Sequence, residues 1–135
     1  MKQYDDAIKV YKIGHKYYND SNNCTVVTTA IAANVPYGKA FNLLKSFGRE
    51  TGKGVPFALI DRQVFRELGF KLIKQGDFNT RWGTVSTITK KLPSKGTFIA
   101  YVRGHVLTIR DGVVMDWTEG RRHRIRNVYQ VVKDI

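Results

Sequence analysis

Cys24 is the only cysteine of this 135-residue chain, and it follows the polar stretch Ser21-Asn22-Asn23 where an apolar run begins. We expect that run to form a helix, which places Cys24 at a helix N-terminus. Unpaired backbone N–H groups and the positive end of the helix dipole favour the thiolate at such a position. Cys24 is therefore a candidate nucleophile.

A histidine and an aspartate lie far downstream in two segments typical of strands. Asp111-Gly112 separates two runs rich in Val and Ile, which predicts a hairpin with a two-residue type I′ turn. Counting back from this turn places His105 and Asp116 diagonally across the two strands, on one face and within reach of each other. A carboxylate that holds one imidazole nitrogen leaves the other to accept a thiol proton. Cys24, His105 and Asp116 form a candidate triad for acyl transfer through a thioester.

The elements that must position these residues follow from hydrophobic periodicity. Residues 1–23 indicate a short helix or strand and a polar loop. Apolar residues at helical spacing predict helices over residues 24–33, 36–47, 57–68 and 84–92. Alternating and β-branched residues predict strands over residues 70–73, 97–102, 105–110, 113–117 and 127–132. Helices followed by antiparallel strands predict a single α+β domain over residues 1–135, with N-terminal helices packed on a C-terminal antiparallel β-sheet.

Composition narrows the class of protein. A hydrophobic fraction of 42% and a charged fraction of 25% are typical of a globular chain. A lone cysteine excludes an internal disulfide, and the first residues lack the apolar core of a signal peptide. No stretch is long enough to cross a bilayer, so we expect a cytoplasmic protein without a membrane partner. The three histidines are too scattered for a zinc site, and we expect no cofactor or metal.

The net charge of +12 is the second unusual feature of the chain. Such a field attracts polyanions and acidic protein surfaces. A basic cluster follows the hairpin and consists of Arg121, Arg122, Arg124 and Arg126. This cluster is a candidate binding site for nucleic acid or an acidic protein, and it is equally typical of a solvated strand edge. Trp82, Tyr101 and Trp117 are candidates for stacking on bases, although aromatic residues in strands usually belong to the core.

The triad residues carry a family resemblance. Asn23-Cys24 at a helix start, Gly104-His105 opening a strand and Asp116 on the next strand resemble the papain-like cysteine peptidase superfamily. The likeness is to its short bacterial and phage members, such as the bacteriocin-processing peptidase domains, and covers most of residues 15–135. It implies a papain-like fold, a peptide or protein substrate and no cofactor. It also implies that Cys24 is the nucleophile, His105 the base and acid, and Asp116 the orienting residue.

One position departs from the family pattern. Many relatives place a glutamine a few residues before the cysteine, where its amide helps to bind the oxyanion. Here Asn19 is the nearest amide, with Tyr18 as an alternative donor. Losing one such donor lowers the rate by about 10²–10³, so the alternative is a catalytically weak or inactive papain-like fold. Such a protein would act as a basic nucleic-acid- or nucleoprotein-binding protein, associated with the virion if it is phage-encoded. Transglutaminase-like and arylamine acetyltransferase-like proteins share the triad order, which leaves hydrolase and transferase both open.

Overall fold

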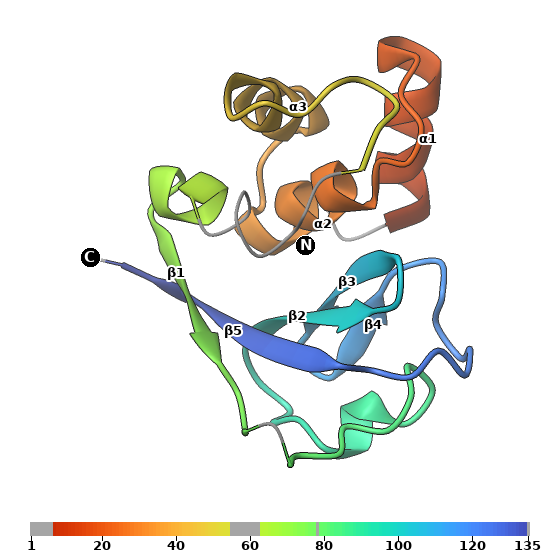
Figure 1. Ribbon diagram of the computed structural model, residues 1–135, viewed down its shortest axis with the longest axis vertical. Coiled ribbons are helices and arrows are strands. Elements are labelled where there is room, and N and C mark those ends of the chain that lie inside the picture. The colour runs from red at the N-terminus through yellow and green to blue at the C-terminus, as the bar shows by residue number, and fades with distance from the viewer. Residues whose placement is uncertain (1–6, 55–62, 78, 135) are drawn as a thin grey trace.

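The structure, a computed structural model, describes residues 7–54, 63–77 and 79–134. A layer of helices lies on one face of an antiparallel sheet (Figure 1). The helices come first in the chain: α1 (Ala7–Tyr18), α2 (Cys24–Ala33) and α3 (Tyr37–Ser46). Residues 63–67 add a short helical segment before the first strand. The α+β class and the order of helices before sheet agree with the sequence prediction.

Over the described residues the sheet has five strands, and every neighbouring pair is antiparallel. Their order across the sheet is β1-β5-β2-β3-β4, so the last strand of the chain lies between the first two. The strands are β1 (Phe70–Lys74), β2 (Thr97–Val102), β3 (His105–Arg110), β4 (Val113–Met115) and β5 (Asn127–Lys133). The prediction of β2 and β3 is confirmed at both ends, and β4 ends two residues earlier than predicted.

Helix α2 is buried on nearly all sides, from Thr25 to Ala33. Its β-branched residues disfavour a helix intrinsically, but burial between the other helices and the sheet outweighs propensity. Buried polar groups fasten α2 to β3: Thr28 Oγ1 donates to Val106 O (3.1 Å), Thr108 Oγ1 donates to Thr28 O (3.3 Å), and the Arg110 guanidinium donates to Ile31 O. The position of α2 along β3 is therefore fixed by hydrogen bonds as well as by packing.

Both faces of the sheet are covered. Strand residues Ile99, Tyr129 and Val131 pack toward α2 and the segment 63–67. The opposite face is covered by the segment that contains the short 3-10 helix η1 (Ile88–Lys90), below the sheet in Figure 1. Val85 and Ile88 from this segment are fully buried against the strands. No helix within the described ranges has the length and apolarity that crossing a membrane requires.

The predicted helix over residues 84–92 is wrong. Only Ile88–Lys90 forms a helical turn, of the 3-10 type, with turns on both sides. Gly83 O, which could accept the first hydrogen bond of that helix, instead accepts from Ile125 N (2.8 Å), and Val85 N donates to His123 O (3.0 Å). Pairing with residues 121–125 therefore replaces the helix that local periodicity favoured.

The other helix predictions agree more closely with the structure over the described residues. The prediction for 36–47 corresponds to α3 with Pro36 and Phe47 as its flanking residues. Residues 1–6 of the N-terminal segment lie outside the described residues, and residues 7–18 form a helix rather than a strand. Of the predicted helix 57–68, residues 57–62 also lie outside them, while 63–67 are helical and end before Gly69, whose φ is 89°.

The turn Asp111-Gly112 is confirmed as the hairpin connection between β3 and β4. Both residues have positive φ, 49° and 78°, as a type I′ turn requires. The predicted register is confirmed over the paired residues: Arg110 with Val113, Ile109 with Val114, and Thr108 with Met115. In this register β4 runs back alongside β3. Asp116, which follows the end of β4, therefore approaches His105, the first residue of β3.

Candidate active site

Cys24 is the first residue of α2, and its half-buried side chain faces the start of β3. Thr28 lies one helical turn further along the same face and binds the carbonyl of Val106 (3.1 Å). The residue beside Val106 is His105, so the same register of α2 on β3 brings the thiol to the imidazole. Val106 also provides a backbone hydrogen bond to the Cys24 sulfur.

Asn23 precedes the helix, and its side chain turns away from the first turn. Asn23 Nδ2 donates to Tyr37 Oη (3.1 Å), and the Asn23 side chain makes no cap hydrogen bond to α2. A cap would have accepted an N–H of the first turn. The amide groups at the start of α2 are therefore left to a thiolate or to a substrate oxygen.

His105 and Asp116 are hydrogen-bonded, as the hairpin register predicted. His105 Nε2 lies 2.9 Å from Asp116 Oδ2, and the two side chains are 15% and 2% exposed. Asp116 Oδ2 also accepts from the backbone N of Thr118 (3.0 Å) and from its hydroxyl (2.5 Å). These bonds hold the carboxylate in the tight turn after β4, and the bond to Nε2 leaves His105 Nδ1 for the thiol.

The thiol and the imidazole shift each other's ionisation. Burial disfavours the thiolate, but the hydrogen bond and charge of His105, with the contacts of Val106 and Thr25, hold the pKa of Cys24 below its usual value. Burial also disfavours the imidazolium, yet hydrogen bonds to Asp116 and Cys24 raise the pKa of His105 to about 9. Each group therefore favours the charged form of the other, and the resulting thiolate–imidazolium pair is the nucleophilic form.

The pair opens into a cleft of about 320 Å³. Tyr11 from α1 and Trp117 form an aromatic wall, with ring centroids 4.8 Å apart, and Trp117 also lies 5.0 Å from the His105 ring. The described lining residues are Tyr11, Asn22, Asn23, Cys24, Gly54, Gly104, His105 and Trp117. A substrate carbonyl in this cleft would meet the sulfur, the imidazole and the start of α2 together.

A buried ion pair supports the loop before Cys24, and sequence reasoning missed it. Arg49 donates to both carboxylate oxygens of Asp20 (3.0 Å each), and these side chains are 2% and 0% exposed. Asp20 also accepts from Tyr37 Oη (2.5 Å) and Gly52 N (2.8 Å). Tyr37 in turn accepts from Asn23, so the network reaches the residue beside the nucleophile.

The network determines the ionisation of its members. Burial opposes the charge on Asp20, but hydrogen bonds from Arg49, Tyr37 and Gly52 keep its pKa below the ordinary value. Burial and the bond to Asp20 raise the pKa of Tyr37, so its hydroxyl stays protonated and donates. Removing one partner of such a buried pair costs about 3–5 kcal/mol. The only signal in the sequence was one acidic and one basic residue 29 positions apart.

The structure places Asn19, the predicted oxyanion donor, away from the thiol. Asn19 is exposed in the turn after α1, with a φ of 49°, and does not belong to the described cleft lining. Asn22 and Asn23 line the cleft instead. Asn22 Nδ2 donates to Gly52 O (3.0 Å), which holds this side chain at the rim. Tyr18 packs on Tyr37 and Phe41 rather than in the cleft.

The predicted basic cluster lies elsewhere on the molecule. Arg121, Arg122, Arg124 and Arg126 are all exposed. Arg124 and Arg126 line a second cavity, which shares none of the described lining residues of the cleft at Cys24. The structure therefore separates the candidate triad from the candidate polyanion site. Among the described residues, no three His, Cys, Asp or Glu side chains lie close enough to hold a metal ion.

Comparison of the chain with protein-family models, curated proteins and solved structures gives no match. Function is therefore inferred from the chemistry of the site.

Proposed function

We propose that the protein is a papain-like cysteine peptidase or a related acyl-transfer enzyme. The observation that carries the proposal is the position of His105, which bonds Asp116 through Nε2 and the Cys24 thiol on its other side, at the mouth of an open cleft. A structural cysteine in the core would need neither an imidazole partner nor access to a cavity. The substrate class is a peptide or protein amide, or another acyl donor.

In the first step, the Cys24 thiolate attacks the carbonyl carbon of the substrate, and a carbon–sulfur bond forms as the carbonyl electrons move onto oxygen. The backbone N–H groups at the start of α2 are the candidate donors to this oxyanion. The Asn22 amide at the cleft rim is the candidate second donor, in place of Asn19. The positive end of the α2 dipole stabilises the charge that develops there.

In the second step, the tetrahedral intermediate collapses and its bond to the leaving amine breaks. The His105 imidazolium gives its proton to the amine nitrogen, which leaves a thioester on Cys24 and a neutral imidazole. His105 then takes a proton from water, or from an acceptor amine, as that nucleophile attacks the thioester. Thiolate and imidazolium are thereby restored, while Asp116 keeps the ring in one orientation.

The proposal is tested by trapping the thioester. A p-nitrophenyl ester should release nitrophenolate in a burst of about one equivalent per protein, a kinetic sign of an acyl-enzyme. The intact mass should rise by one acyl group, and Cys24→Ser should abolish the burst. Asp116→Asn should slow it without removing the acylation site. A wild-type protein that acquires no acyl group on Cys24 would contradict the proposal.

The fate of the thioester separates hydrolase from transferase. Mixing the acyl-enzyme with water alone or with a primary amine should show which nucleophile regenerates the free thiol faster. Peptide mapping after incubation with unfolded protein substrates would reveal cleavage and its sequence preference. The alternative function, a basic nucleic-acid- or nucleoprotein-binding protein with an inactive triad, predicts slow modification of Cys24 that does not depend on His105.

A further inference from the structure

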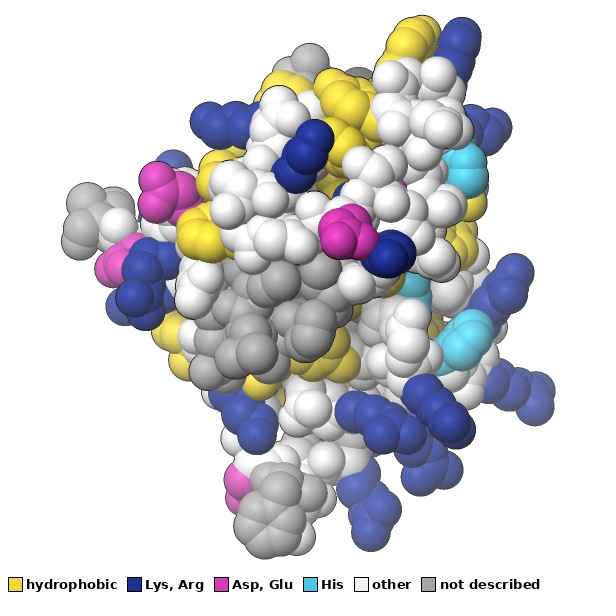
Figure 2. Space-filling view, turned by 45° about the horizontal axis from the view of Figure 1, so that its top comes forward, with side chains coloured by type: hydrophobic (Ala, Val, Ile, Leu, Met, Phe, Trp, Pro, Cys, Tyr) yellow, Lys and Arg dark blue, Asp and Glu magenta, His cyan; other side chains and the backbone are white. Residues whose placement is uncertain are grey.

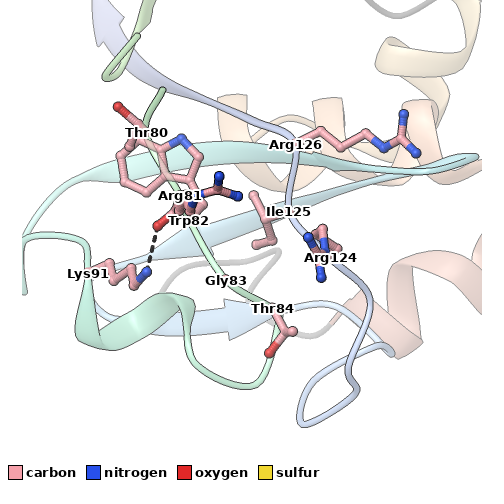
Figure 3. Close-up of a pocket in the computed structure, with 9 residues that line it drawn as sticks. All are labelled: Thr80, Arg81, Trp82, Gly83, Thr84, Lys91, Arg124, Ile125 and Arg126. Atoms are coloured by element: carbon pink, nitrogen blue, oxygen red, sulfur yellow. Dashed lines mark hydrogen bonds between the residues drawn. The ribbon is translucent and has the colours of Figure 1, made fainter. Parts of the chain in front are cut away.

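The second cavity has a volume of about 610 Å³. It is lined in part by the segment around η1, which Figure 1 shows on the side of the sheet opposite the helices. Figure 3 shows its side chains arriving from three separate segments of the chain. Arg81 and Trp82 come from the segment before η1, Lys91 follows η1, and Arg124 and Arg126 precede β5. We call this set the basic groove.

The backbone beneath the basic groove is held by hydrogen bonds. Thr84 and Arg124 form an antiparallel bridge, flanked by the bond from Ile125 N to Gly83 O (2.8 Å). Arg126 N donates to Tyr101 O at the edge of β2 (2.8 Å). Ile125, between the two arginines, is buried in the core. The cationic side chains therefore project from a backbone that is already held in place, which reduces the conformational entropy that the protein loses when a ligand binds.

The charge of the basic groove is uncompensated. Of the described residues that line it, four are cationic and none is acidic. No ion pair joins these cations to a carboxylate in the part of the chain that the structure describes. Asp77, nearby in sequence, instead accepts from Asn79 N (2.8 Å) and the Thr80 hydroxyl (3.4 Å). Lys and Arg side chains also crowd the lower right of Figure 2, on the side away from the helices.

Trp82 distinguishes the basic groove from a merely basic surface. Its indole is half-buried, packs against the core under the sheet, and lines the cavity among the cations. An aromatic platform within a positively charged groove is the combination that holds single-stranded nucleic acid, because every base has a π-face. An acidic peptide would satisfy the cations but would leave the indole without a planar partner.

We propose that the basic groove binds single-stranded nucleic acid. Backbone phosphates lie against Arg81, Arg124 and Arg126, and one base stacks on Trp82. Lys91, whose Nζ donates to Arg81 O (2.5 Å), adds positive charge at the far side. This site needs no residue of the Cys24 cleft, so it stands whether or not the triad is active.

The proposal is tested by fluorescence anisotropy with a labelled oligo(dT) of about 15 nucleotides, a length within the range of single-strand sites. Arg124→Gln with Arg126→Gln should lower affinity at least about tenfold at about 50 mM salt and reduce the slope of log K against log[salt] by about 1.4. The matched control is Lys39→Gln with Lys45→Gln, which removes the same charge from exposed positions on α3. This control should retain most of the affinity.

Trp82→Leu supplies the second measurement and should lower affinity by about tenfold while leaving the salt slope unchanged. Circular dichroism shows whether that variant is folded, and the arginine pair tests the site independently. Equal losses in the arginine and lysine pairs would overturn the proposal in favour of a diffuse surface field. Duplex DNA that binds as tightly as the single strand, or poly-glutamate that competes as well as oligo(dT), would also overturn it.

Discussion

His105 is the residue on which the ionisation of the cleft depends. It contacts a carboxylate on one side and a thiol on the other, and both contacts favour its charged form. The contact between His105 and the thiol also lowers the pKa of Cys24, although burial of the thiol acts in the opposite direction. A single imidazole therefore favours the thiolate and holds the proton that the leaving group would need.

The pH dependence of alkylation by iodoacetamide tests this coupling. In the wild type, Cys24 should react well below the pH at which an ordinary thiol does, because its pKa is lowered. His105→Ala removes the hydrogen bond and the charge, so the thiol pKa rises and alkylation at neutral pH slows by about tenfold per pKa unit. The two rates should converge at alkaline pH, and acyl transfer should decline above about 9 as His105 loses its proton.

His123→Ala is the matched control, because His123 is exposed and lies outside the described lining of the Cys24 cleft. It should leave the alkylation profile unchanged. An unshifted profile in His105→Ala would mean that the imidazole does not activate the thiol.

At the scale of elements, the cleft depends on how closely α1 approaches the loop before α2. Gly14 permits this approach, since a Cβ there would lie 2.4 Å from Tyr37 Oη and 2.6 Å from Asn23 Nδ2. Both side chains are almost fully buried and hydrogen-bonded to each other, so neither can move without disturbing the network on Asp20. The position of the nucleophile is thus linked to helix packing behind it.

Gly14→Ala should destabilise the protein, against the usual gain of about 1 kcal/mol for this change within a helix. Overpacking a buried contact costs about 1–3 kcal/mol, and displacement of Asn23 should also slow alkylation of the neighbouring thiol. Chemical denaturation with the iodoacetamide assay measures both effects. Lys12→Ala, an exposed change on the same helix, is the control. A more stable Gly14→Ala protein would show that the approach is looser than described.

At the scale of the whole molecule, the two candidate sites lie on opposite sides of one sheet. The triad lies between the helical layer and the start of β3, and the basic groove lies among the loops beneath the other face. The net charge of +12 affects both the stability of the fold and the binding of charged molecules. Like charges repel within the compact state, while the same field attracts polyanions.

Salt should therefore change stability and binding in opposite directions. Raising NaCl from about 0.1 M to about 1 M shortens the Debye length from about 10 Å to about 3 Å, so the midpoint of thermal unfolding should rise as repulsion is screened. Oligonucleotide affinity should fall over the same range, because counterions released into a more concentrated salt solution gain less entropy. Near pH 10, close to the isoelectric point, the same salt should leave the midpoint almost unchanged. A midpoint that falls with salt at neutral pH would contradict this account.

Turn chemistry and periodicity explain why much of the candidate site could be predicted. Asp111-Gly112 specifies a turn whose register places Asp116 near His105, and the apolar run after Asn23 specifies a helix that starts at Cys24. These are local properties, because the residues that determine each element lie within it. The prediction for 84–92 failed where a distant segment, 121–125, offered better partners for the backbone.

The sequence by itself predicted the three residues of the candidate triad, and it determined the hairpin that joins two of them and the excess of positive charge. Only the tertiary structure decided which other residues meet them. Asp20 forms an ion pair with Arg49, 29 positions away, and Trp82 and Arg124 line one cavity beside the bridge between Thr84 and Arg124. The physical reason is that contacts between residues distant in sequence depend on the packing of the whole chain. A local sequence pattern reflects only the residues within one element, so it does not predict those contacts.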